Sequence, residues 1–134
     1  MAKLEEIEGI GPAYAEKLTQ AGIGSTEALL EAGATAAGRK TLADATGIGG
    51  ALLLRWVNHA DLYRITGIGK QYAELLEASG VDSVPELAQR NGANLHDKLS
   101  AVQSEKKLTG RVPALSQVED WIQQAKNLPR VVSH

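Results

Sequence analysis

Apolar residues recur along the chain at the spacing of amphipathic α-helices. The pattern is clearest in one run of apolar positions at Leu52, Leu53, Trp56, Val57 and Ala60. Shorter helices are predicted over three further ranges, 12–21, 26–32 and 36–45. Ser25 or Thr26, and then Thr35, are typical N-caps for the last two of these, and Gly33 is a typical helix end. The pattern predicts an all-α fold.

Between the predicted helices the phrase Gly-Ile-Gly occurs three times. We call these segments turn 1, turn 2 and turn 3, at residues 9–11, 47–49 and 67–69. Two glycines allow a tight turn with positive φ and a close approach of the backbone. Each isoleucine is too apolar for an exposed tip, so we expect it to fold back between the flanking helices. The pattern is typical of a helix-hairpin-helix, in which the amides that begin the second helix form a phosphate or carboxylate site.

The chain also repeats itself. Residues 7–33 match residues 65–91 at an offset of 58. Later segments match at larger offsets, which pair Trp56 with Trp121. The second copy therefore carries small insertions, most of them within residues 94–107.

A fourth segment, turn 4 at residues 110–113, is the counterpart of turn 2 and has lost the second glycine. With it, the repeat predicts tandem helix-hairpin-helix motifs in two pseudo-symmetric halves. The first half is predicted to span residues 1–62 and the second residues 63–128. A short apolar connection favours their packing as one compact body. The tail, residues 129–134, is expected to be irregular or frayed.

The repeated segments resemble a bacterial domain-of-unknown-function family of tandem helix-hairpin-helix proteins. The resemblance is carried by IEGIGPAYAEKL, AGATAAGRKTLA, TGIGGALLLRWVNHADL, GVDSVPELAQRN and QVEDWIQQAKNLPRVV. It covers nearly the whole chain and implies the fold, without implying an activity. More distantly, the turns resemble the helix-hairpin-helix domains of DNA repair polymerases, ligases and topoisomerases. That resemblance implies a nucleic-acid backbone as a ligand, held without reading of its sequence.

The charge of the chain is unlike that of a strongly basic nucleic-acid binder, because the formal net charge of its 134 residues is −2. The formal charge alternates along the sequence, at −4 over residues 1–33, +2 over 34–66, −2 over 67–92 and +2 over 93–134. A solvated surface of mixed sign is the simpler interpretation. A local basic cluster stays open for Arg39, Lys40, Arg55, Arg64 and Lys70.

Turns 2 and 3 are the better candidates for binding phosphate. Turn 2 is followed by a third glycine and, further along the helix, by Arg55, whereas turn 3 is followed directly by Lys70. Turn 1 is followed by Pro12, which lacks an amide donor, and has glutamates on both sides. The predicted phosphate-binding residues are Gly47, Gly49, Gly50, Arg55, Gly67, Gly69 and Lys70. The competing interpretation is a purely structural turn between antiparallel helices, which needs the same glycines.

No set of nucleophile, base and orienting residue can be assembled from the sequence, so no catalytic residue is predicted and an enzyme is not expected. The three histidines lie far apart and lack ligand spacing, so no metal site is predicted. The serines Ser25, Ser83 and Ser116 are typical caps. No cofactor is expected beyond a monovalent cation that a hairpin can hold. Trp56 and Trp121 are expected to anchor the core of each half.

Two functions stay open at this point. The first is a non-catalytic, sequence-independent DNA-binding module that contacts the phosphate backbone through the Gly-Ile-Gly turns. The alternative is a protein-protein interaction or scaffold module, including a homodimer, that has lost nucleic-acid binding; the net charge and the acidic turn 1 favour it. No apolar run approaches the length of a membrane span and no signal peptide opens the sequence, so we expect a cytoplasmic location and no membrane contact.

Overall fold

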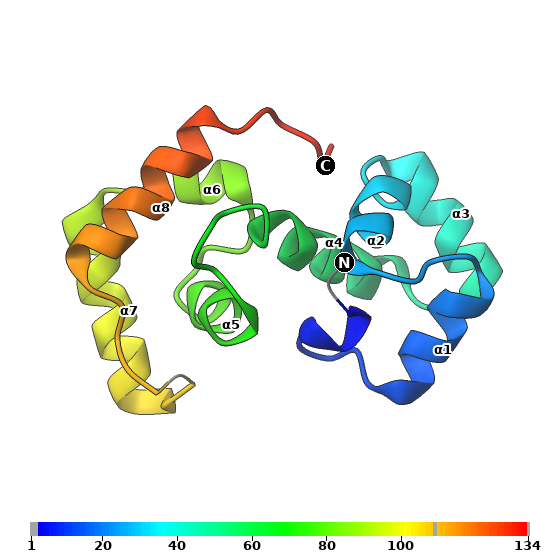
Figure 1. Ribbon diagram of the computed structural model, residues 1–134, viewed down its shortest axis with the longest axis horizontal. Helices are drawn as coiled ribbons and strands as arrows, with labels where there is room; N and C mark the ends of the chain where they lie inside the picture. Colours follow the sequence, from blue (N-terminus) through cyan, green and yellow to red (C-terminus); the bar gives the residue numbers. More distant parts are fainter. Residues whose placement is uncertain (1–2, 109, 134) are drawn as a thin grey trace. The chain divides into compact units, whose positions relative to one another are not determined.

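The computed structural model describes residues 3–108 and 110–133, so Thr109 of turn 4 and His134 of the tail lie outside the described residues. The described residues form one 3-10 helix and eight α-helices, without a strand (Figure 1). The elements are η1 (Leu4–Glu6), α1 (Pro12–Gln20), α2 (Thr26–Ala32), α3 (Ala36–Thr46), α4 (Gly50–Leu62), α5 (Lys70–Ala78), α6 (Val84–Ala88), α7 (Gly92–Lys106) and α8 (Leu115–Asn127). The predicted all-α fold is confirmed.

The chain divides into two compact units. Unit 1 is Met1–Asp61 with Val131–His134, and unit 2 is Leu62–Arg130. Turns 1 and 2 therefore lie in unit 1, and turns 3 and 4 in unit 2. The predicted pseudo-symmetry of the two halves and their packing as one compact body stay predictions.

Four helices begin with a side-chain cap. An oxygen of the capping side chain accepts a hydrogen bond from an amide in the first turn, at 3.0 to 3.3 Å. The capping residues are Ser25 for α2, Thr35 for α3, Ser83 for α6 and Asn91 for α7. Of the two predicted alternatives for α2, Ser25 is the cap and Thr26 is the first helical residue. The prediction for Ser116 is wrong, because α8 begins after Ala114 and Ser116 lies within its first turn.

The two tryptophans lie in the cores, as predicted. Trp56 is 0% exposed and Trp121 is 1% exposed. Each contacts one tyrosine: the ring centroids are 5.1 Å apart for Tyr14 and Trp56, and 5.2 Å apart for Tyr72 and Trp121. In a chain without phenylalanine, these aromatic pairs supply the largest apolar surfaces available for burial.

The tail was expected to be irregular or frayed, and its described residues, 129–133, are irregular, since they form no helix or strand. Val132 is buried, and the Ser133 N–H donates to the Ala34 carbonyl at 2.8 Å. The buried Arg39 side chain donates to the Ser133 carbonyl at 2.7 Å and to the Gly33 carbonyl at 2.9 Å. An apolar anchor and a hydrogen bond to a buried guanidinium thus hold residues 132–133 within unit 1.

Candidate functional site

The two glycines of each turn have different backbone conformations. The first glycine is in the left-handed region, with φ of +96° at Gly9, +74° at Gly47 and +98° at Gly67. The second is extended, with φ of −89° at Gly11 and −111° at Gly69. The sequence argument for positive φ therefore holds for the first glycine alone.

The first glycine of turns 1 and 3 also lies in tight contact with a buried side chain. A Cβ atom on Gly9 would lie 3.2 Å from Nε1 of Trp56, and one on Gly67 would lie 3.0 Å from Nε1 of Trp121. Both indole nitrogens are buried, and neither has a hydrogen-bond partner in the described structure. The indole edge thus lies directly behind the turn, and a side chain on the first glycine would displace it.

The second glycine meets no such constraint. A Cβ atom on Gly11, Gly49 or Gly69 would have no atom within 4 Å among those described. The extended backbone at Gly11 and Gly69 is accessible to any residue. The fold of the chain therefore does not require glycine at these positions, and its effect is to leave open the space in front of the following helix.

The isoleucine between the glycines is buried in all three turns, with 4% of Ile10, 3% of Ile48 and 5% of Ile68 exposed. The expectation that it folds inward is confirmed. The glycines of turns 2 and 3 are exposed on either side of it. Each turn thus places an apolar anchor in the core and presents its backbone to solvent.

The helices that follow the turns begin without a side-chain cap. Gly11 and Gly69 are the N-caps of α1 and α5, and neither provides a capping hydrogen bond. Gly49 precedes α4, and its carbonyl accepts the Leu53 N–H at 3.1 Å. The amides of a first helical turn have no partner within the helix and need one from outside. At α2, α3, α6 and α7 the N-cap side chain supplies such a partner. Gly11 and Gly69 at α1 and α5, Gly49 before α4, and Ala114 at α8 have no side-chain acceptor to offer.

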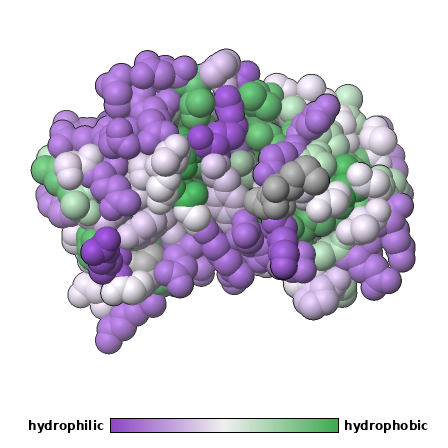
Figure 2. Space-filling model, viewed as in Figure 1, coloured by the Kyte–Doolittle hydropathy of each residue, from purple (hydrophilic) through white to green (hydrophobic). Residues whose placement is uncertain are grey.

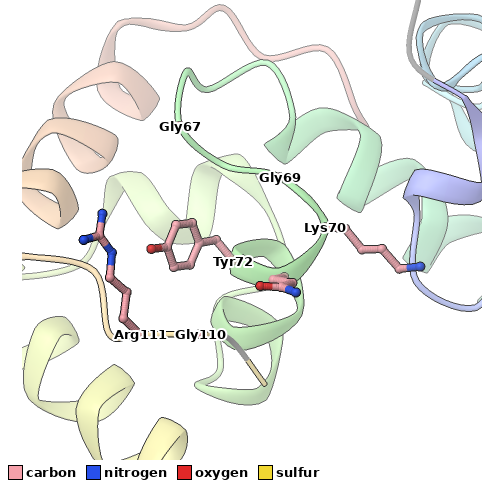
Figure 3. Close-up of a pocket in the computed structure, with 7 residues that line it drawn as sticks. Gly67, Gly69, Lys70, Tyr72, Gly110 and Arg111 are labelled. Carbon is pink, nitrogen blue, oxygen red and sulfur yellow. The ribbon is translucent and has the colours of Figure 1, made fainter. Parts of the chain in front are cut away.

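Unit 2 has a cavity of about 530 Å³ directly at turn 3 (Figure 3). Two segments far apart in the sequence form it: turn 3 with the first turn of α5, and the start of turn 4. The lining residues are Gly67, Gly69, Lys70, Gln71, Tyr72, Gly110 and Arg111. Figure 3 shows the side chains of Tyr72 and Arg111 on the same side of α5, whereas the Lys70 side chain extends away from both. Three predicted phosphate-binding residues, Gly67, Gly69 and Lys70, thus share one cavity.

Arg111 is a site residue that the sequence analysis did not select. It lies at the position that Ile48 has in turn 2, so the second copy has an exposed cation where the first has a buried apolar side chain. The replacement of an isoleucine by an arginine could have marked Arg111 as a site residue. Selecting it would have required knowing that turn 4 folds beside turn 3, which the sequence alone does not show.

The remaining predicted residues lie in unit 1. Gly47, Gly49 and Gly50 are exposed in and after turn 2. The Arg55 guanidinium, predicted to serve turn 2, lies beside turn 1: its Nη1 is 3.4 Å from the position of a Cβ atom on Gly9. The side chain of Arg55 reaches turn 1 because α4 carries it alongside Trp56, which packs behind that turn.

Arg39 and Arg64 do not contribute to a basic cluster at the turns. Arg39 is 7% exposed and donates to backbone carbonyls of unit 1. Arg64 donates to the Pro129 carbonyl at 3.1 Å. Both guanidinium groups are therefore engaged in holding the last residues of the chain.

The two units differ in charge. Unit 1 has five Lys or Arg and eight Asp or Glu residues, a formal charge of −3. Unit 2 has nine and eight, a formal charge of +1. The cavity at turn 3 therefore lies in the unit whose formal charge is more favourable to an anion.

Within the described part of the chain, no group of three or more His, Cys, Asp or Glu side chains is placed to hold a metal ion. Among the helices of the described residues, none combines the length and the apolar character needed to cross a membrane.

These features define an all-helical chain in which glycine turns lead into helices that have no side-chain cap. The chain belongs to the family described as Domain of unknown function (DUF4332), whose model matches residues 8–128. The match begins just before turn 1 and ends just after α8, so it includes all four turns. No curated protein and no solved structure matches the chain.

Proposed function

We propose that the chain is a non-catalytic DNA-binding module that contacts the phosphate backbone through its Gly-Ile-Gly turns, independently of base sequence. In this proposal the turns are the hairpins of tandem helix-hairpin-helix motifs, arranged in two pseudo-symmetric halves. The observation that carries it is the contrast between the helix starts. Four helices have a side-chain cap, whereas α1, α4 and α5 follow a glycine that leaves the space before their first amides open.

A phosphate fits the place that a capping side chain takes elsewhere. Phosphate oxygens accept hydrogen bonds from first-turn amides, and the positive end of the helix dipole favours the negative charge. A serine or aspartate at the second glycine would fill the same space and satisfy the same amides. The exposed glycine therefore favours an external acceptor over an internal one.

Turn 3 is the strongest of the candidate sites. It is followed by Lys70, shares its cavity with Arg111, and lies in the unit with formal charge +1. Turn 2 comes second. The space before Gly50 is free, which favours an external acceptor, but Arg55, the cation predicted to serve turn 2, lies at turn 1. Turn 1 is weakest, because Pro12 at the first helical position lacks an amide donor.

Contacts of this kind position a protein on DNA without reading its sequence. Backbone amides and a flexible lysine recognise phosphate oxygens, which are the same at every base pair. The proposed binding is therefore sequence-independent, dominated by electrostatics, and weakened by salt.

The direct experiment is fluorescence anisotropy with labelled DNA at about 50 and 150 mM salt. We expect the wild-type chain to bind with a Kd on the order of micromolar at the lower salt concentration and more weakly at the higher one. Lys70→Glu should lower the affinity by about tenfold, because it reverses the charge beside the proposed phosphate site. Lys17→Glu is the matched control, since it changes the net charge equally in unit 1.

Two results would overturn the proposal. One is the absence of binding by the wild-type chain at the lower salt concentration. The other is an equal loss in Lys70→Glu and Lys17→Glu, which would assign the effect to net charge instead of turn 3. Circular dichroism of each variant confirms that a loss of affinity is not a loss of fold.

The alternative, a protein-protein interaction or scaffold module, is favoured by the formal charge of −3 on unit 1. Three large apolar side chains are exposed among the described residues: Tyr14, Leu115 and Val131. On the face in Figure 2, hydrophilic residues predominate and hydrophobic residues form separate groups between them. An interaction module would give no salt-sensitive DNA binding, and as a homodimer it would sediment at twice the monomer mass.

A further inference from the structure

The cavity at turn 3 has an aromatic wall in addition to its phosphate-binding features. Tyr72 follows Lys70 and Gln71 in the first turn of α5, packs against Trp121 in the core, and also lines the cavity. The volume of about 530 Å³ is in the range of small-ligand pockets. The cavity is therefore larger than one phosphate group needs.

The corresponding tyrosine of unit 1 has a different environment. Tyr14 packs against Trp56 in the same way, but the Lys17 ammonium lies 5.9 Å from the centroid of its ring. At the position of Lys17 in the second copy stands Leu75, which is fully buried. The Tyr14 ring thus has a lysine ammonium over it. At Tyr72 the equivalent residue is a buried leucine, and the ring lines a cavity.

Arg111 adds a second planar group to this cavity. It comes from turn 4, and Figure 3 shows it on the same side of α5 as the Tyr72 ring. Tyrosine rings and guanidinium planes are the groups on which unstacked nucleic-acid bases lie, without a preference for one base. Phosphate-binding amides beside such a pair match the two chemical parts of one nucleotide.

We propose that this cavity takes one unstacked nucleotide of a single DNA strand. Its phosphate lies at the first amides of α5, and its base lies against Tyr72 and Arg111. The inference rests on the proposed function and adds a preference to it. Bases of a duplex are stacked and paired, so a duplex offers the phosphates without the free base, and the chain prefers single-stranded DNA.

The test compares a labelled thymidine oligonucleotide with a duplex of equal length, by anisotropy at low salt. We expect the wild-type chain to bind the single strand at least about fivefold more tightly, as stacking of one base requires. Tyr72→Leu, which keeps apolar bulk against Trp121, should lower single-strand affinity by about five- to tenfold and leave duplex affinity unchanged. Tyr14→Leu is the matched control, because it alters the equivalent aromatic pair in unit 1.

The outcomes separate this inference from the proposed function. Equal affinity for the two DNA forms, or a Tyr72→Leu variant that binds the single strand like the wild type, overturns the inference and leaves backbone binding intact. Absence of binding to both forms overturns both. If Tyr72→Leu does not fold, amide chemical shifts of the wild-type chain decide: on adding the oligonucleotide, changes should concentrate at residues 67–72 and 110–111, and changes elsewhere contradict the site.

Discussion

Turns 1 and 3 have nearly the same backbone and different surroundings. Their first glycines have φ angles of +96° and +98°, and each lies against the indole nitrogen of a buried tryptophan. After the second glycine the two sequences differ, because turn 1 continues with Pro12 and turn 3 with Lys70. Turn 1 lies in a unit of formal charge −3, and turn 3 in a unit of formal charge +1.

The comparison separates the residues that fold a turn from those that suit it to a ligand. The first glycine and the isoleucine serve the fold in both turns, since one accepts the left-handed backbone and the other is buried. The residues that differ come after the turn or approach it from elsewhere. A Gly-Ile-Gly turn therefore predicts its own shape, whereas the proposed phosphate binding depends on the number of amide donors and on nearby cations.

The largest effect on stability is expected from alanine at the first glycine. Gly67→Ala forces a Cβ into the left-handed region and places it 3.0 Å from Nε1 of Trp121. We expect a loss of about 2 to 4 kcal/mol in the free energy of unfolding, from backbone strain and from displacement of the indole. Gly9→Ala should lose a similar amount for the same reasons. Urea denaturation measures both.

Alanine at the second glycine is the control for this comparison. Gly69→Ala introduces a Cβ that meets no described atom within 4 Å, on an extended backbone. Its cost should stay below about 1 kcal/mol, as expected for an N-cap change from glycine to alanine. Equal losses of stability in Gly67→Ala and Gly69→Ala would contradict the claim that the fold requires the first glycine and not the second.

The next largest effect concerns an arginine in each unit. Arg39 is buried and donates to carbonyls of Gly33 and Ser133, so Arg39→Ala removes both hydrogen bonds, one of them to the buried Gly33, and should cost about 2 to 3 kcal/mol. Arg90 in unit 2 is about one-third exposed and pairs with Glu86, so Arg90→Ala should cost under about 1 kcal/mol. Thermal denaturation compares the two. A larger loss for Arg90→Ala would contradict the account of the tail.

The smallest effect is expected at the caps, where the units should agree. Ser25 and Ser83 accept from first-turn amides at 3.1 and 3.3 Å. Ser25→Ala and Ser83→Ala should each cost about 1 kcal/mol, since each leaves one amide without its acceptor. Urea denaturation of the two variants checks this. A cap that costs nothing to remove would weaken the contrast between capped and uncapped helices.

Local features of the fold could be predicted well from the sequence. The helix Thr26–Ala32 matches its predicted range, and Ser25, Thr35 and Ser83 are the caps that their residue types indicated. The burial of Trp56 and of the turn isoleucines also followed from the apolar pattern. These properties depend on near neighbours in the chain, so periodicity and residue type are sufficient to predict them.

Features that depend on distant segments could not be predicted. The proximity of Arg55 to Gly9, and of Arg111 to turn 3, results from tertiary packing. The same holds for Arg39, whose charge suggested a surface cluster and whose guanidinium instead holds the tail. In each case the residue type was informative, but the decisive partner (Gly9 for Arg55, turn 3 for Arg111 and Ser133 for Arg39) is more than thirty residues away in the sequence.

The central claim is that the first-turn amides of α5 hold a DNA phosphate, and Gly69→Ser tests it most directly. A serine fits the extended N-cap backbone, and its hydroxyl can accept a hydrogen bond from a first-turn amide, which Gly69 cannot. We expect unchanged or slightly higher stability together with a roughly tenfold loss of DNA affinity, equivalent to one hydrogen bond to a charged group. Gly11→Ser, the same change before α1, should leave the affinity within about twofold of wild type. A folded Gly69→Ser variant that binds DNA as tightly as the wild-type chain would contradict the claim.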